Sequence, residues 1–230
     1  MKEFLCNSVF FGVTVSILGY EIGLFLKKKF KKAVFNPLLI SIIFVMVVLI
    51  IFRVDYNSYN NGAKYLSYLL TPATVCLAIP LYQQLELLKS NIKAIMIGII
   101  SGVLSSLGSV LLFSMLFHFT HKQYVTLLPK SITTAIGMGV SEELGGIVTI
   151  TVAVIIITGV LGNMLAEVIC KIFRISEPIA KGIAIGSASH AIGTSKAMEM
   201  GEIEGAMSSL AIVVSGLFTV IGASIFANFM

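Results

Sequence analysis

The chain has 230 residues, of which 57% are hydrophobic and only 12% are charged, and its mean hydropathy is +1.00. A soluble domain carries about 25% charged residues, so this composition excludes an ordinary soluble enzyme and indicates an integral membrane protein. We expect an all-α fold of about seven transmembrane helices. The length leaves room for a single membrane domain over residues 1–230.

The net charge of +5 does not indicate a nucleic-acid partner. Five lysines lie in the run Lys27–Lys32 between two apolar segments, and no basic, aromatic face of the kind that binds single strands is present. The positive-inside rule places this run in the cytoplasm. We therefore expect a multi-pass protein of the cell membrane, embedded in the lipid bilayer, with its N-terminus outside and its C-terminus in the cytoplasm.

The N-terminal apolar run Phe4–Leu26 is 23 residues long, which exceeds the apolar core of about 7–15 residues in a signal peptide. No Ala-x-Ala cleavage site follows it. We expect residues 1–32 to form an N-terminal helix and a cytoplasmic lysine-rich loop.

Four further segments are apolar and long enough to cross the hydrocarbon core, which takes about 20 residues. Three other stretches are apolar but interrupted by Pro, Gly or polar residues. The crossing segments are Ala33–Phe52, Ala94–Phe117, Ile147–Phe173 and Ala206–Met230, and the interrupted ones are Tyr65–Tyr82, Ser131–Gly146 and Gly182–Gly201.

The charges after Ser131–Gly146 indicate how this segment lies. If it crosses, Lys171, Arg174 and Lys181 end up outside, against the positive-inside rule, whereas a segment that dips in and returns leaves them in the cytoplasm. We prefer the re-entrant interpretation. Residues 118–146 then form an external loop and a re-entrant segment.

With this topology, residues 33–117 and 147–230 become two inverted repeats of three segments each. The middle segment of each repeat is broken, at Thr71–Pro80 and at Gly186–Thr194. Inverted repeats with paired broken helices are the layout of secondary transporters. Chance similarity between apolar segments is the alternative. A short polar linker is expected after each break, over Gln83–Lys93 and Lys196–Gly205.

The two breaks are the expected substrate site. Irregular backbone at membrane depth survives only inside protein or along a wet cavity, and half-helix N-termini offer free N–H groups to an anion. We expect hydroxyls and dipoles, rather than a fixed cation, to hold a substrate carboxylate, with Lys196 at the rim. Kinked helices that bind nothing are the alternative. The residues concerned are Thr71, Pro72, Thr74, Pro80, Ser187, Ser189, His190, Gly193 and Thr194.

Glu142 and Glu143 lie among glycines and hydroxyls in the expected re-entrant segment. An acidic residue at the centre of a membrane helix costs about 2.5–3.5 kcal/mol, so the pair either lies at the membrane surface or lines an aqueous path. His190 either titrates on that path or forms a structural hydrogen bond between helices. The residues expected on the transport or proton path are Ser131, Thr133, Thr134, Glu142, Glu143, Gly145, Gly146 and His190.

Other patterns indicate architecture rather than chemistry. Small residues recur at helical spacing, which favours close helix packing; they are Gly98, Gly102 and Ser106, and also Ser101, Ser105 and Ser109. The three cysteines are far apart and lack metal-ligand spacing. No hydrolase or P-loop motif occurs, so we expect no catalytic residue, no metal, no cofactor and no enzyme activity.

Three motifs, taken in order along the chain, resemble the LrgB/CidB family. They are Thr71–Tyr82, then Leu128–Thr134 with Ser141–Gly146, then Ser189–Thr194 with Gly201–Gly205. The resemblance covers essentially the whole chain, including Asn36-Pro37. One departure is Ala135, which stands where the family pattern has Pro.

The resemblance implies two functions. Family members are described as antiholin-like regulators of murein hydrolase export and cell lysis, usually encoded beside a smaller holin-like protein of the LrgA/CidA type. A plastid relative exchanges glycolate and glycerate, and bacterial members are tied to pyruvate movement.

We therefore consider two hypotheses. The first is a secondary transporter of small organic anions, monocarboxylates such as glycolate, glycerate, pyruvate or lactate, with or without proton coupling. The second is an antiholin-like regulator that acts with a small holin-like partner. The paired broken segments favour the first, because a lysis regulator has no need of them. We expect a homo-oligomer in either case.

Overall fold

A computed structural model of the chain describes residues 9–30 and 35–230. Every regular element in these ranges is a helix, so the all-α prediction is confirmed. The chain divides into two compact units, Met1–Cys76 and Leu77–Met230, here called the N-terminal and the C-terminal unit. This division falls inside the stretch expected as the middle of the first repeat, and the inverted-repeat arrangement stays a prediction.

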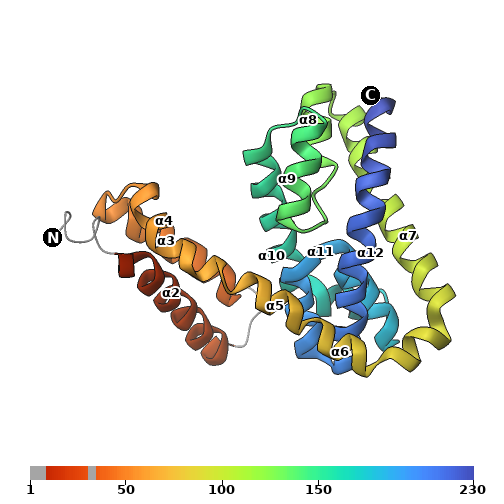
Figure 1. Cartoon of the computed structure of the whole chain (residues 1–230), viewed down its shortest axis with the longest axis horizontal. Helices are drawn as coiled ribbons and strands as arrows, with labels where there is room; N and C mark the ends of the chain where they lie inside the picture. The colour runs from red at the N-terminus through yellow and green to blue at the C-terminus, as the bar shows by residue number, and fades with distance from the viewer. Residues whose placement is uncertain (1–8, 31–34) are drawn as a thin grey trace. The chain divides into compact units, whose positions relative to one another are not determined.

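The N-terminal unit begins its described part with a long apolar helix and continues with three shorter ones (Figure 1). Asn36 caps the helix that begins at Pro37. Its side chain accepts hydrogen bonds from Leu38 N at 2.9 Å and Leu39 N at 3.3 Å, which satisfies two free donors of the first turn. The helices are α2 (Val9–Phe30), α3 (Pro37–Phe52), α4 (Tyr56–Ser67) and α5 (Leu70–Cys76).

Helices α2 and α4 approach each other closely at Gly12. A Cβ atom there would overlap the backbone of Tyr59 and Ala63, so only glycine fits. Next to this point the hydroxyls of Ser16 and Tyr59 lie 2.7 Å apart. The lysine run continues past α2 into Lys31 and Lys32, which lie outside the described residues.

The C-terminal unit contains the remaining helices. In Figure 1, α7 and α12 run along this unit, and α8 lies at the end that carries the C-terminus. Tyr124 of α8 donates a hydrogen bond to Phe226 O at 2.8 Å, which fixes that end. The elements are α6 (Ala78–Gln83), α7 (Leu85–Leu116), α8 (His121–Leu127), α9 (Thr134–Glu143), α10 (Val148–Ile172), α11 (Pro178–Met200), α12 (Glu202–Phe226) and the 3₁₀ turn η1 (Ala227–Phe229).

Four helices in the described part are long and apolar enough to cross a membrane. Together with the shorter apolar helix α3, they identify a multi-pass membrane protein, as the composition predicted. The four spans are Phe10–Phe30, Leu85–Leu116, Val148–Ile172 and Glu202–Phe229.

The predicted polar linkers are largely helical, which corrects the sequence-based boundaries. Helix α7 begins at Leu85, well before the apolar stretch that starts at Ala94, and α11 runs on to Met200, so that only Gly201 separates it from α12. Polar residues do not end a helix by themselves, because straight-chain Lys, Glu and Gln are good helix formers.

The breaks fall where the sequence placed them. Pro72 and Pro80 each lie in the first turn of a short helix, α5 and α6, where a missing N–H costs nothing. Helix α11 loses helical geometry at His190, whose φ of 42° and ψ of −143° lie outside the helical region. A positive φ at a residue other than glycine is strained, so the surroundings of His190 must hold the break.

The segment after α8 forms a hairpin that returns to its starting point. Ile147 N donates to the Thr126 hydroxyl at 2.8 Å, which joins the two ends of residues 127–146. At its far end the hydroxyl of Ser131 lies 3.0 Å from that of Ser106, inside α7. Ser106 is ten residues before the end of α7 at Leu116, so the hairpin reaches about 15 Å along that helix. This geometry agrees with the re-entrant interpretation.

Candidate functional site

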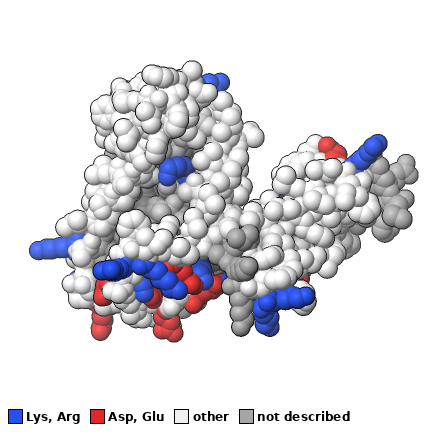
Figure 2. Space-filling view, turned by 180° about the vertical axis from the view of Figure 1, so that it is seen from behind, with Lys and Arg blue, Asp and Glu red and all other residues white. Residues whose placement is uncertain are grey.

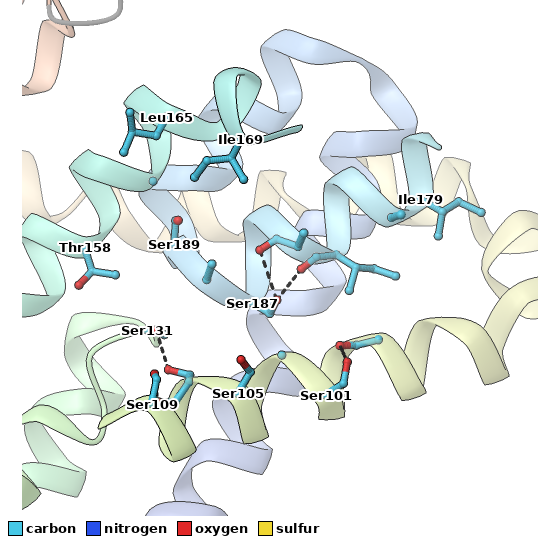
Figure 3. Close-up of a pocket in the computed structure, with 18 of the residues that line it drawn as sticks. Ser101, Ser105, Ser109, Ser131, Thr158, Leu165, Ile169, Ile179, Ser187 and Ser189 are labelled. Atoms are coloured by element: carbon cyan, nitrogen blue, oxygen red, sulfur yellow. Dashed lines mark hydrogen bonds between the residues drawn. The ribbon is translucent and has the colours of Figure 1, made fainter. Parts of the chain in front are cut away.

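A cavity of about 1140 Å³ lies in the C-terminal unit, among α7, the first half of α11, α10 and the tip of the hairpin (Figure 3). Its lining is dominated by small and hydroxyl-bearing residues. A cavity in an apolar bundle that is lined in this way can hold water and polar solutes.

One face of α7 forms the floor of the cavity. The lining positions run from Asn91 to Ser109 at steps of three or four residues, with adjacent pairs at residues 101–102 and 105–106, which is one stripe of a helix. From Asn91 to Ser109 the helix rises by about 27 Å, close to the roughly 30 Å thickness of the hydrocarbon core. Beside this stripe the same helix carries Ile95, Ile99 and Leu107, which are completely or almost completely buried in the protein core.

The serines of this stripe differ in what they offer a solute. Ser101 and Ser109 donate to carbonyl groups of α7 itself, at 2.8 Å in both cases, so they present acceptor oxygens. Ser105 has no hydrogen-bond partner among the described residues and can donate. In Figure 3 the hydroxyls of Ser101, Ser105 and Ser109 point from α7 toward the space below α11.

The facing wall comes from α11 and α10. Gly102 of α7 lies so close to α11 that a Cβ there would be 3.0 Å from Ser187 Oγ, and Ser187 donates to Ile183 O at 2.7 Å. Ser189 is only 4% exposed, and its hydroxyl lies over Gly162 of α10, which has no side chain to displace it. No partner for that hydroxyl occurs in the described part of the chain.

The hairpin tip brings a cation to the cavity. Lys130 is the basic residue of the lining, is half-buried and donates to Ser131 Oγ at 3.0 Å. No carboxylate among the described residues forms an ion pair with it. The lining of this cavity therefore includes a cation beside the neutral donors, and the expectation that neutral groups alone hold a substrate carboxylate stays a prediction. The sequence placed Lys130 in the external loop that precedes the re-entrant segment. Its position near α7 results from the folding back of the hairpin, which the sequence does not show.

His190 supports the break in α11 from behind the cavity. Its Nε2 lies 3.0 Å from Ile155 O on α10, and since a carbonyl can only accept, Nε2 carries the hydrogen. Gly159 leaves room for the ring, because a Cβ there would be 2.8 Å from Nε2. His190 is 3% exposed and does not line the cavity, which matches the structural alternative considered for this residue.

Other polar groups satisfy the backbone around the break. The Thr194 hydroxyl donates to His190 O at 3.0 Å and lies 2.7 Å from the Ser208 hydroxyl on α12. Asn163 of α10 donates its side-chain amide to Ile192 O at 2.7 Å. Hydrogen bonds of this kind make a broken helix tolerable at membrane depth.

The predicted substrate residues thus separate into groups. Ser187 and Ser189 line the cavity, whereas His190, Gly193 and Thr194 do not. Thr71, Pro72 and Thr74 belong to the N-terminal unit. The side chains of Thr71 and Thr74 lie outside the described part. Pro80 is in α6, which packs on α12. Their role in substrate binding stays a prediction.

The predicted path residues also separate. Ser131 lines the cavity. Glu142 and Glu143 are exposed at the end of α9 and do not line it. Gly145, with φ of 78°, and Gly146 form the turn that follows, and a Cβ at Gly146 would be 3.1 Å from Thr126 Cα. Thr133 and Thr134 start α9 outside the cavity lining.

The opposite end of the C-terminal unit is charged. Lys196 contacts Glu167 at 2.6 Å and Glu199 at 3.2 Å, so Lys196 belongs to an ion-pair network and not to the rim of the serine-lined cavity. Figure 2 shows the acidic and basic side chains gathered at this end. A second cavity of about 690 Å³ there is lined by Lys171, Arg174 and Lys181 among others, so the three cations used to predict topology lie together.

No group of three or more His, Cys, Asp or Glu that could hold a metal ion is found within the described ranges. The α7 serines are the site residues that the sequence interpretation assigned to helix packing alone. Their spacing, together with Asn91 on the same stripe, was the available signal for a polar path.

Comparison with known proteins identifies the family. The model of the LrgB-like family matches residues 16–229. The chain belongs to the LrgB-like family. The resemblance found in the three sequence motifs is thereby confirmed.

Relatives within the LrgB-like family align along nearly their whole length. Antiholin-like protein LrgB of Bacillus subtilis (strain 168) is 38% identical over 222 residues, which is 96% of each chain. Holin-like protein CidB of Staphylococcus aureus (strain Mu50) is 37% identical over 207 residues, which is 90% of each chain. Antiholin-like protein LrgB of Bacillus mycoides (strain KBAB4) is 37% identical over 222 residues, or 96% of each chain. No solved structure is a significant match.

The names of these LrgB-like relatives agree with the second hypothesis drawn from the sequence. They describe antiholin-like and holin-like proteins, and none of the three names states a transport activity.

Proposed function

We propose that this chain is an antiholin-like or holin-like membrane protein that influences murein hydrolase release and cell lysis together with a small holin-like partner. The support is the name carried by its LrgB and CidB relatives, at 37–38% identity over 90% or more of each chain. These names favour the regulatory hypothesis over transport as the physiological role.

We propose further that the molecular activity behind this role is the passage of small organic anions through the serine-lined cavity. One observation carries this proposal: a stripe of polar and small residues, Asn91–Ser109, follows α7 for about the thickness of the hydrocarbon core. Lys130 next to this stripe favours anions over cations, since a half-buried ammonium group without a carboxylate partner repels a second positive charge.

Purified protein in liposomes tests the activity. Saturable uptake of pyruvate, glycolate or lactate is expected, with an entrapped dye retained. Unselective dye leakage would indicate a pore instead, and neither uptake nor leakage would contradict the proposed activity.

A cavity-blocking variant connects the activity to the cavity. Ala184 of α11 lines the cavity, so Ala184→Phe is expected to abolish uptake. Ala153 of α10 is exposed and does not line it, so Ala153→Phe is the matched control and should transport normally.

The regulatory role is tested in cells that lack the native gene. Murein hydrolase activity in the medium and lysis rate are compared after complementation with wild type, Ala184→Phe and Ala153→Phe. If passage of anions underlies the role, Ala184→Phe fails to complement. If Ala184→Phe complements fully while uptake is lost, the regulatory role does not depend on the cavity.

A further inference from the structure

The tip of the re-entrant hairpin presents a positive charge to the cavity. Lys130 is half-buried, and the acidic residue of the same lining, Glu177, lies toward the Asn91 end. Ser106, which marks the position of the hairpin tip, is fifteen residues from Asn91, or about 22 Å along α7. The two charges therefore stand at different ends of the cavity.

One of the two hydrogen bonds at the tip has a fixed direction. An ammonium group can only donate, so Ser131 accepts from Lys130 at 3.0 Å. The hydroxyls of Ser131 and Ser106 lie 3.0 Å apart, and either can donate to the other. In both cases one hydroxyl hydrogen of the pair remains for a solute. Lys130 also retains two of its three N–H donors, so the tip offers donors and a net charge, which is the requirement of a carboxylate.

A separate observation on the facing wall indicates a ligand. Ser189 is only 4% exposed and lines the same cavity. Its hydroxyl has no hydrogen-bond partner in the described part of the chain. The hydroxyl of this buried residue faces the cavity, so it can donate a hydrogen bond to a bound solute or to water.

We propose that Lys130, with the Ser131–Ser106 hydroxyl pair and with Ser189 from the facing wall, forms the binding site for the carboxylate of the transported anion. This proposal rests on the proposed anion passage and assigns its charge selectivity to one side chain. The hydrogen bond to Ser131 holds the ammonium group at the tip while leaving it able to release the anion, as turnover requires.

The test measures charge selectivity inside the cavity without requiring transport. Ser105 lines the cavity and has no hydrogen bond to lose, so it is replaced by Cys in a chain whose three native cysteines are changed to Ser. The modification rates of Ser105→Cys by an anionic reagent, sulfonatoethyl methanethiosulfonate, and by its cationic trimethylammonioethyl counterpart are compared.

Three further substitutions are made in that background: Lys130→Gln, Lys130→Arg and, as matched control, Lys122→Gln. Lys122 is exposed on the neighbouring helix α8 and does not line the cavity. The ratio of anionic to cationic rates is expected to fall about tenfold or more in Lys130→Gln, the effect of losing one charge-assisted hydrogen bond. Lys130→Arg and Lys122→Gln are expected to keep the original ratio.

An unchanged ratio in Lys130→Gln would overturn the proposal even if the wild type transports anions. A Lys130-dependent ratio in a protein that transports nothing would leave the binding site standing and count against the proposed activity. Pyruvate or acetate should slow modification by either reagent in the wild type, and equal protection in Lys130→Gln would also overturn the assignment.

Discussion

Gly186 is a position where α11 and α12 approach each other closely, and its replacement by Ala tests how tightly the two helices pack. A Cβ atom at Gly186 would overlap the carbonyl oxygen of Ser208 and would lie 2.9 Å from both Ser208 Cα and Ala211 Cβ. None of these atoms is the end of a flexible side chain, so the helices must move apart to admit one methyl group.

The magnitude follows from two opposing terms. Overpacking of a filled interior costs about 1–3 kcal/mol, and exchanging Gly for Ala inside a helix returns about 0.5–1 kcal/mol. We expect a net loss of about 1–2 kcal/mol. Since 1 kcal/mol corresponds to about 2–4 °C for a chain of this size, the apparent melting temperature should fall by about 2–8 °C.

The assay is thermal unfolding of the purified protein in detergent at one scan rate, because unfolding of such proteins is often irreversible. Gly108→Ala in the middle of α7 is the matched control, since a Cβ there meets nothing within 4 Å, and it should melt at or above the wild-type temperature. If Gly186→Ala melts as high as Gly108→Ala, the close approach of α11 and α12 is not as described.

Three further predictions concern the hairpin, its carboxylates and the topology. Thr151→Val removes the hydroxyl that joins α10 to two buried partners, at 2.9 and 2.7 Å, and should destabilise the protein by about 1–3 kcal/mol; Val at the exposed Thr149 should change little, and equal melting temperatures would contradict the contact. Gln at Glu142 or Glu143 is expected from the sequence to abolish or uncouple uptake in liposomes while folding persists, and wild-type uptake by both variants would leave these residues as surface groups. Lys29→Cys should react with an impermeant thiol reagent only after cells are permeabilised, and reaction in intact cells would reverse the predicted orientation.

The sequence by itself determined the class of the protein and much of its local structure. Long apolar runs have no stable place in water, so they indicated membrane helices wherever they were about 20 residues long. Pro72 and Pro80 lie in the first turns of two short helices, where the backbone donor that proline lacks is not needed. The small residues around His190 allowed a break in α11, and loop charges pointed to the hairpin that returns at Ile147. These are local properties, and they can be read along the chain.

Only the tertiary structure decided which polar groups meet. The serines of α7 repeat at a spacing that suits close packing and a polar path equally well, and the placement of α11 against Gly102 left the stripe Asn91–Ser109 as the floor of a cavity. No pattern in the sequence indicated that Lys130 lies near α7, because this contact depends on how far the hairpin folds back. The interaction between two charges depends on their distance in space and not on their separation along the chain. The folded structure therefore decides that Lys130 lines the cavity and that Lys196 forms an ion pair with Glu167.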